Sequence, residues 1–291
     1  MASKTKSIVV LIFVALLLAL QLFASDDREQ SIQLANGVRL RFVEQGNQAA
    51  TPIIFLHGYT DSWRSFENVL SLFPKKFHVI AISQRGHGDS DHPDAYHLHN
   101  FAGDLAQFVT MKRLRPGVIV GHSLGGLVAQ QFAIDYPELT KAIIIESSAP
   151  SFADNDGVPE FLSDVMRLTD PIDRQFAEAF QSSTIAKPLP PGTIDVYVNE
   201  STKVPAQVWH GIASEILVTD YTGDLHKIKV PVLIMWGDKD AFCSWADQDQ
   251  FTRLLPASRL IVYEGFGHAL HWEDPSRYVK DVIRFFKCVS K

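Results

Sequence analysis

The sequence predicts an α/β fold: a mostly parallel central sheet with helices on both faces and an inserted helical cap. Short apolar runs rich in Val and Ile alternate with helical patterns over most of the 291 residues. This alternation stops over residues 149–228, where prolines separate short helical patterns. Alternating strands and helices form a mainly parallel sheet, because each helix carries the chain back across one face before the next strand begins.

The core elements are expected in a regular order. The pair Asn36-Gly37 lies between two strand-like segments and is typical of a hairpin turn. The predicted strands are 31–34, 38–44, 53–56, 79–82, 118–120, 142–145, 232–236 and 260–263. The predicted core helices are 62–73, 100–112, 124–136, 245–255 and 275–287.

Residues 149–228 form the expected cap, inserted between the two parts of the core, 26–148 and 229–291. A cap over a site excludes water and shapes the pocket beneath it. Its helices are predicted at 159–168, 172–181, 193–203 and 206–217, and several have a proline near the first turn, where proline is tolerated. The cap side chains expected at a substrate are Phe161, Val165, Phe176 and Trp209.

Residues 1–25 are expected to be a secretory signal peptide or an N-terminal membrane anchor. Lys4 and Lys6 precede an unbroken apolar run, residues 8–20, as in an export signal. The residues before Ala24 and Ser25 fit a small-residue cleavage pattern poorly, so both alternatives stay open. Either one places the rest of the chain outside the cytoplasm, with membrane association through residues 7–24 if the segment is retained.

Composition restricts the class of partner. Hydrophobic residues make up 46% of the chain, which supports a sizeable core, and charged residues make up an ordinary 21%. The formal net charge is −6, and no basic cluster stands out. A nucleic-acid partner is therefore not expected.

The most informative motif is Gly121-x-Ser123-x-Gly125, which lies between the strand at 118–120 and a helical pattern. A serine at such a tight strand-to-helix turn has a strained backbone, and side chains at Gly121 and Gly125 would clash. The turn exposes the hydroxyl, and the N-terminus of the new helix points its amides at whatever that hydroxyl attacks. Ser123 is therefore predicted to be a nucleophile. The alternative is an ordinary strand-to-helix turn in which Ser123 is the N-cap of the helix.

A nucleophilic serine needs a base and an acid that orients the base. Asp240 follows the predicted strand at 232–236, and His268 follows the strand at 260–263. In a parallel sheet the carboxyl ends of the strands gather at one edge, where ligands bind. Residues distant in sequence are thus expected to converge there, in the chain order Ser, Asp, His.

Five motifs, in this order, resemble those of α/β-hydrolase fold enzymes over most of the chain from about Ser31. They are Leu56-His57-Gly58-Tyr59, Gln84-Arg85-Gly86-His87-Gly88-Asp89-Ser90, Gly121-His122-Ser123-Leu124-Gly125-Gly126, Trp236-Gly237-Asp238-Lys239-Asp240 and Gly267-His268. One departure is Ser83, where the family often has an aspartate two residues before the arginine of the second motif.

The resemblance implies a role for each matching position. Ser123 resembles the nucleophile, His268 the general base, and Asp240 the acid that fixes the imidazole tautomer. The backbone N–H groups of Tyr59 and Leu124 resemble the oxyanion hole. No metal or cofactor is needed for this chemistry.

Four other residues compete for these roles or lie close to them. Asp238 is a rival to Asp240, and family spacing favours Asp240. Glu146 ends the strand at 142–145 and is a second rival acid, as in some family members. His271 is a rival base, but we expect it, like His57, to line or cover the substrate pocket. His122 is expected to pack beside the turn.

The resulting hypothesis is a serine hydrolase that cleaves a small, hydrophobic carboxylic ester through an acyl-enzyme. A lactonase or a carbon–carbon bond hydrolase would use the same three residues. A non-catalytic ligand receptor on the same fold is an alternative from a different class. Relatives that use an aspartate nucleophile are disfavoured, because Ser123 would form an ether that water does not readily open.

Overall fold

The computed structural model describes residues 28–153, 155 and 157–290. The export or anchor segment expected at residues 1–25 lies outside the described residues. No helix among residues 28–290 that the structure describes is long and apolar enough to cross a membrane.

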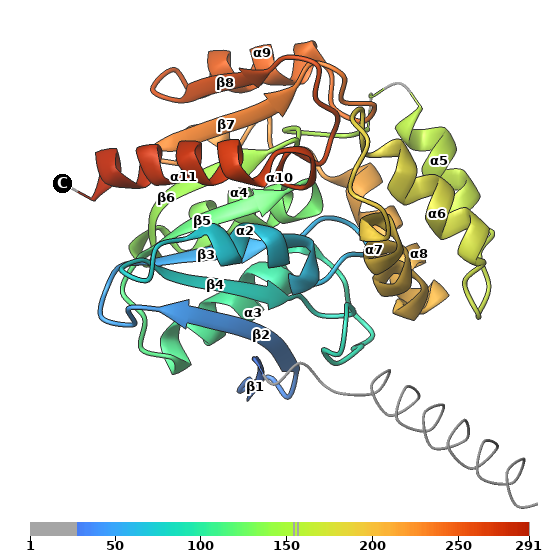
Figure 1. Ribbon diagram of the computed structural model, residues 1–291, viewed down its shortest axis with the longest axis horizontal. Coiled ribbons are helices and arrows are strands. Elements are labelled where there is room, and N and C mark those ends of the chain that lie inside the picture. The colour runs from blue at the N-terminus through green and yellow to red at the C-terminus, as the bar shows by residue number, and fades with distance from the viewer. Residues whose placement is uncertain (1–27, 154, 156, 291) are drawn as a thin grey trace, which may run out of the picture.

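Eight strands form one sheet in the order β1-β2-β4-β3-β5-β6-β7-β8 (Figure 1). The first two strands pair antiparallel with each other, β2 pairs antiparallel with β4, and the remaining strands are parallel. The strands are β1 (Glu29–Gln33), β2 (Arg39–Gly46), β3 (Pro52–Leu56), β4 (His78–Ser83), β5 (Gly117–His122), β6 (Thr140–Glu146), β7 (Val232–Gly237) and β8 (Arg259–Tyr263). The predicted fold class is confirmed.

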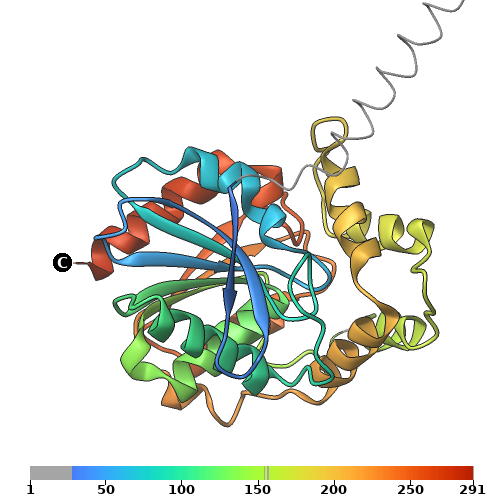
Figure 2. The ribbon, with the colours of Figure 1, turned by 90° about the horizontal axis from the view of Figure 1, so that it is seen from below.

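Helices cover both faces of the sheet (Figures 1 and 2). The apolar side chains of α2 and α11 pack on one face, and those of α3, α4 and α9 pack on the other. Their bounds are α2 (Glu67–Leu72), α3 (Leu98–Met111), α4 (Leu124–Asp135), α9 (Trp245–Leu254) and α11 (Pro275–Val289). The helix predicted at 62–73 begins as a 3-10 turn, η1 (Trp63–Phe66), and a short helix α10 (Leu270–Glu273), which the sequence analysis did not predict, precedes α11.

The chain between β6 and β7 forms a helical cap at one end of the sheet (Figure 2). It contains α5 (Val158–Val165), α6 (Arg174–Ser183), α7 (Thr193–Lys203) and α8 (Ala206–Val218). Buried side chains of α5 and α8, such as Leu162 and Trp209, belong to the same apolar cluster as the α3–α4 face of the sheet. The cap and the sheet therefore share one core.

Candidate active site

Ser123 lies between β5 and α4 in a conformation that side chains rarely adopt, with φ 52° and ψ −114°. Its amide donates a hydrogen bond of 2.9 Å to the carbonyl of Glu146 on the adjacent strand. A Cβ at Gly121 would lie 2.0 Å from the Gly125 oxygen, and one at Gly125 would lie 2.2 Å from the Leu56 oxygen. The motif's glycines are thus required sterically, and the turn holds the serine at the start of a helix.

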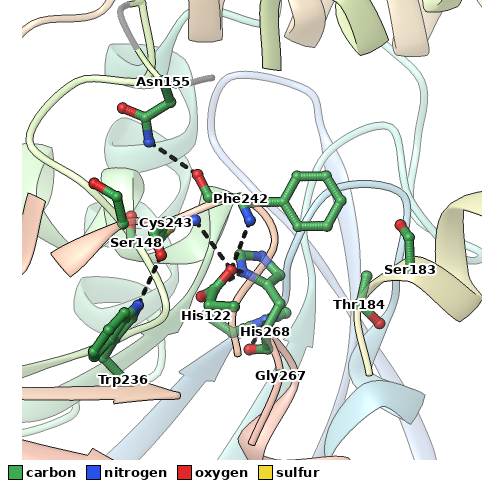
Figure 3. A network of polar contacts seen from close by, with 12 residues as sticks. His122, Ser148, Asn155, Ser183, Thr184, Trp236, Phe242, Cys243, Gly267 and His268 are labelled. Carbon is green, nitrogen blue, oxygen red and sulfur yellow. Dashed lines mark hydrogen bonds and ion pairs between the residues drawn. The ribbon is translucent and has the colours of Figure 1, made fainter. Parts of the chain in front are cut away.

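His268 and Asp240 meet at the carboxyl ends of β8 and β7. The Nδ1 atom of His268 lies 2.8 Å and 2.9 Å from the two carboxylate oxygens of Asp240. One of these oxygens also accepts the amide N–H groups of Phe242 at 2.8 Å and Cys243 at 3.0 Å (Figure 3). Three donors thus hold the carboxylate, which fixes the proton of the imidazole on Nδ1 and leaves Nε2 to accept one.

The rival residues have other partners. Asp238 accepts a hydrogen bond from the amide of Gly265 and so joins the two loops that follow β7 and β8. Glu146 pairs with His271, whose Nδ1 atom lies 2.7 Å from a carboxylate oxygen. His268 and His271 thus each have a carboxylate partner, and of these two pairs it is His268 and Asp240 that belong to the candidate site.

His122 lies behind the site, with its ring 4.9 Å from the ring of His268 and 4.8 Å from that of His271. Its Nε2 atom donates to the carbonyl of His268 at 3.2 Å. Burial and the neighbouring imidazoles hold the pKa of His122 well below its usual range. His122 is therefore a neutral support under the loop of His268.

The amides of Tyr59 and Leu124 are the candidate oxyanion donors. Among the described residues neither amide has a hydrogen-bond acceptor, and both residues line the same cavity as Ser123. Leu124 is the first residue of α4, so the helix dipole adds to its amide. The hydroxyl of Tyr59 donates to the carbonyl of Trp209 at 2.5 Å, which connects this loop to the cap.

The candidate nucleophile, base and oxyanion donors line a narrow, mostly apolar cavity. Ser123 and His268 supply polar side chains beside the two candidate oxyanion amides, and the cap and the loop after Asp240 supply most of the walls. Its lining residues are Tyr59, Ser123, Leu124, Phe152, Val158, Phe161, Leu162, Phe180, Ile216, Phe242 and His268. Such a site takes an apolar group beside the nucleophile.

Of the cap side chains expected at a substrate, Phe161 lines the cavity. Val165, Phe176 and Trp209 do not. Val165 is fully buried in the cap, and Phe176 stacks on Phe161. The Trp209 ring packs against Tyr59, and its Nε1 donates within the cap to the Val204 carbonyl. These rings support the wall from behind.

The expectation that His57 and His271 line the pocket is corrected by the structure, because both side chains are fully buried away from the cavity. His57 donates to the Gly58 carbonyl at 2.8 Å and accepts from the Gln84 amide at 3.0 Å. Burial lowers its pKa to about 4, so His57 is neutral and braces the oxyanion loop.

Several wall residues were not predicted from the sequence, among them Phe152, Val158 and Phe242. Phe242 lies two residues after Asp240, and its ring packs 4.9 Å from that of His268. Its position just after the candidate acid is the feature of the sequence that could have indicated a place near the site. Helical periodicity identifies an apolar face but not which neighbour that face meets.

Asp61, two residues after Tyr59, is a buried acid for which the sequence predicted no role. Its carboxylate accepts the Gln181 amide at 3.0 Å and the Ser65 hydroxyl at 3.2 Å. Burial raises its pKa to about 7, and these hydrogen bonds offset only part of that effect.

The imidazole and carboxyl groups of His122, Glu146 and His271 are close enough together to hold a metal ion. However, both ring nitrogens of His271 are engaged, with Glu146 at 2.7 Å and Ser65 at 3.0 Å. His271 thus has no unpaired ring nitrogen to offer a cation, whereas His122 Nδ1 and Glu146 Oε2 have no hydrogen-bond partner among the described residues.

Comparison with known proteins agrees with this fold. A family model described as alpha/beta hydrolase fold matches residues 51–275. The chain is 28% identical to a non-heme chloroperoxidase of Streptomyces lividans, over 88% of this chain and 99% of that protein. It is 26% identical to lipase 1 of Psychrobacter immobilis, over 84% of this chain and 79% of that protein. An esterase structure from Exiguobacterium antarcticum superposes with a TM-score of 0.81 at 23% identity, over 89% of this chain and 99% of that chain.

The chain therefore belongs to the α/β-hydrolase fold family. It is an enzyme of the hydrolase type, as the sequence motifs predicted.

Proposed function

We propose that the protein is a serine hydrolase that cleaves carboxylic esters with an apolar group through an acyl-enzyme. The observation that carries the proposal is the cavity itself. It brings together a serine on a strained turn, an imidazole held by a carboxylate, and two amides without acceptors. These are the groups that acyl transfer requires.

The reaction proceeds in two halves. Ser123 Oγ attacks the ester carbonyl while His268 Nε2 takes the hydroxyl proton, and the amides of Tyr59 and Leu124 stabilise the oxyanion. When the tetrahedral intermediate collapses, His268 gives that proton to the leaving alcohol. Water, deprotonated by His268, then attacks the acyl carbonyl, and the acid leaves as Ser123 regains its proton.

Asp240 keeps the imidazole in the reactive tautomer and stabilises the imidazolium that forms in each half. The apolar walls favour an uncharged substrate, because the described lining residues include no Asp, Glu, Lys or Arg. Burying an ionised group there without a partner would cost free energy.

The test is Ser123→Ala, assayed with a fluorophosphonate probe and with p-nitrophenyl esters of increasing chain length beside lactones. We expect labelling to disappear and ester kcat to fall by at least about 10⁴-fold. Unchanged ester turnover in Ser123→Ala would refute the nucleophile. A wild-type protein that binds esters but neither labels nor turns them over would be a receptor, and turnover of lactones alone would make it a lactonase.

Two neighbouring aspartates provide a matched pair for the acid. Asp240→Asn should lower kcat by about 10³- to 10⁴-fold, because the imidazole then takes the wrong tautomer. Asp238→Asn should leave kcat close to the wild-type value, since an amide oxygen can still accept from Gly265. Equal losses in the two variants would contradict the assignment of Asp240.

A further inference from the structure

The last turn of α6 in the cap contacts the loop that carries the oxyanion donor. The side-chain amide of Gln181 donates to Asp61 at 3.0 Å and to the Ser201 hydroxyl of α7 at 2.7 Å. Ser201 in turn lies 2.9 Å from the Thr60 hydroxyl. Thr60 and Asp61 directly follow Tyr59, so this network holds the oxyanion loop against two cap helices.

The same turn also contacts the loop of the catalytic histidine. The carbonyl of Thr184 accepts the amide N–H groups of His268 at 2.8 Å and Ala269 at 3.0 Å. Figure 3 shows Thr184 beside Gly267 and His268. The loop of His268 is thus hydrogen-bonded to the main chain of the cap.

Glu273 of α10 adds a second connection between the cap and this loop. One of its carboxylate oxygens accepts the amide of Gly267 at 3.0 Å and that of Ala186 at 2.7 Å. The approach is close, because a Cβ at Gly267 would lie 2.7 Å from the Ala186 nitrogen. Glu273 therefore holds Gly267, the residue before His268, next to Ala186 of the cap.

We propose that residues 181–186 form a positioning clamp that fixes the His268 loop relative to the oxyanion loop, with Gln181 and Glu273 as positioning residues. This inference rests on the proposed function. The clamp segment belongs to the cap, yet it bonds one loop through Gln181 and the other through Thr184 and Ala186. The α6–α7 half of the cap is thus a part of the catalytic framework and does not swing away as a lid.

The physical reason is the geometric demand of acyl transfer. The proton moves from Ser123 to His268 only when both atoms and the oxyanion amides are aligned, and an error of about 1 Å costs on the order of 10²-fold in rate. Gln181 and Thr184 are almost fully buried, so their hydrogen bonds do not compete with water. Such bonds hold the two loops at one fixed separation.

The first test is Gln181→Leu, with Gln175→Leu as a control on the exposed face of the same helix. We expect Gln181→Leu to lower kcat per folded molecule by about 10- to 100-fold with little change in KM, because substrate still binds the intact cavity. The rate of fluorophosphonate labelling of Ser123 should fall in parallel. Gln175→Leu should label and turn over at the wild-type rate.

The second test uses Glu273, which is less buried and therefore less demanding for folding. Glu273→Ala removes the acceptor of the Gly267 and Ala186 amides, and we expect a fall in kcat of about tenfold. Glu273→Gln keeps an acceptor oxygen at that point and should restore most of the rate. Recovery in the glutamine variant separates positioning by hydrogen bonds from an effect of the charge.

Two results would overturn the clamp. The first is a Gln181→Leu protein that has the wild-type kcat per folded molecule but a lowered melting temperature. That result would mean that Gln181 has a purely structural role. The other is equal activity in Glu273→Ala and Glu273→Gln. Failure of the proposed function looks different, because the wild-type protein itself would then not label at Ser123.

Discussion

Two histidines three positions apart each have their own carboxylate partner. His268 pairs with Asp240 at the cavity, and His271 pairs with Glu146 in the core and also contacts the Ser65 hydroxyl at 3.0 Å. The second set has the residue types of a catalytic triad. Ser65 is almost fully buried and does not line the cavity, so no substrate reaches it. Access, more than residue type, separates the two sets.

Asp61 should make stability depend on pH. Its pKa is raised to about 7 in the folded protein from an ordinary 3.8, so the folded state holds a proton that the unfolded state has lost between these values. The resulting stabilisation is fully present below about pH 4 and is lost as pH rises through about 7.

Asp61→Asn should remove this dependence, because an amide does not ionise. The unfolding free energy of the wild-type protein should fall by up to about 2.6 kcal/mol between pH 5 and pH 8 because of Asp61, and Asp61→Asn should lack this fall. Urea unfolding at both pH values measures it. Parallel pH profiles in the two proteins would contradict the assignment.

At the scale of elements, local sequence determines most of the fold. All eight predicted strands and every predicted helix are present, with ends displaced by a few residues, because each has a clear apolar period and a turn at its boundary. The short α10 was missed, since it holds only the four residues Leu270–Glu273. Motifs placed Ser123, Asp240 and His268 at one edge, because each follows a strand of a parallel sheet.

Other parts of the site depend on packing that sequence does not encode locally. The pairing of Glu146 with His271 joins residues 125 positions apart in sequence. The contact of Gln181 with Asp61 joins a cap helix to a core loop. Neither residue type nor spacing indicates such partners, and the same is true of the choice between Phe161 and Phe176 as a wall.

The elbow between β5 and α4 should be intolerant of any side chain at Gly125. A Cβ there would overlap the Leu56 carbonyl of β3, so the helix would have to move away from the sheet. Gly125→Ala should destabilise the fold by at least about 2 kcal/mol and abolish labelling of Ser123. Gly223→Ala is the matched control, because a Cβ at Gly223 meets no atom within 4 Å. Thermal unfolding and probe labelling of both variants provide the check.

For the whole molecule, the proposed reacting side chains and most of the apolar cavity wall come from different parts of the chain. Ser123, Asp240 and His268 lie in the turns and loops that follow core strands, whereas cap helices supply much of the apolar wall. Because this wall belongs to an insertion between β6 and β7, its side chains can change without altering the sheet. Selectivity for the apolar group of the substrate is therefore expected to depend on the cap.

Phe161→Ala should enlarge the cavity and shift the preferred ester toward longer chains, because the ring forms part of the wall. Phe176→Ala removes the ring stacked behind it and should shift the preference less, since Phe176 does not line the cavity. Values of kcat/KM for a series of p-nitrophenyl esters measure both effects. A larger shift in Phe176→Ala would refute the assignment of the wall.

Glu146, His271, Ser65 and Asp61 form one continuous row of hydrogen bonds in the protein interior. The number of hydrogens in this row affects the net charge of the folded chain. Three hydrogen bonds in a row need three hydrogens, but ionised acids, a neutral ring and one hydroxyl supply only two. Asp61 is the acid that can hold the third hydrogen, because burial raises its pKa to about 7. The folded chain near neutrality then carries one unit less negative charge than its formal −6, which would appear as slower migration toward an anode.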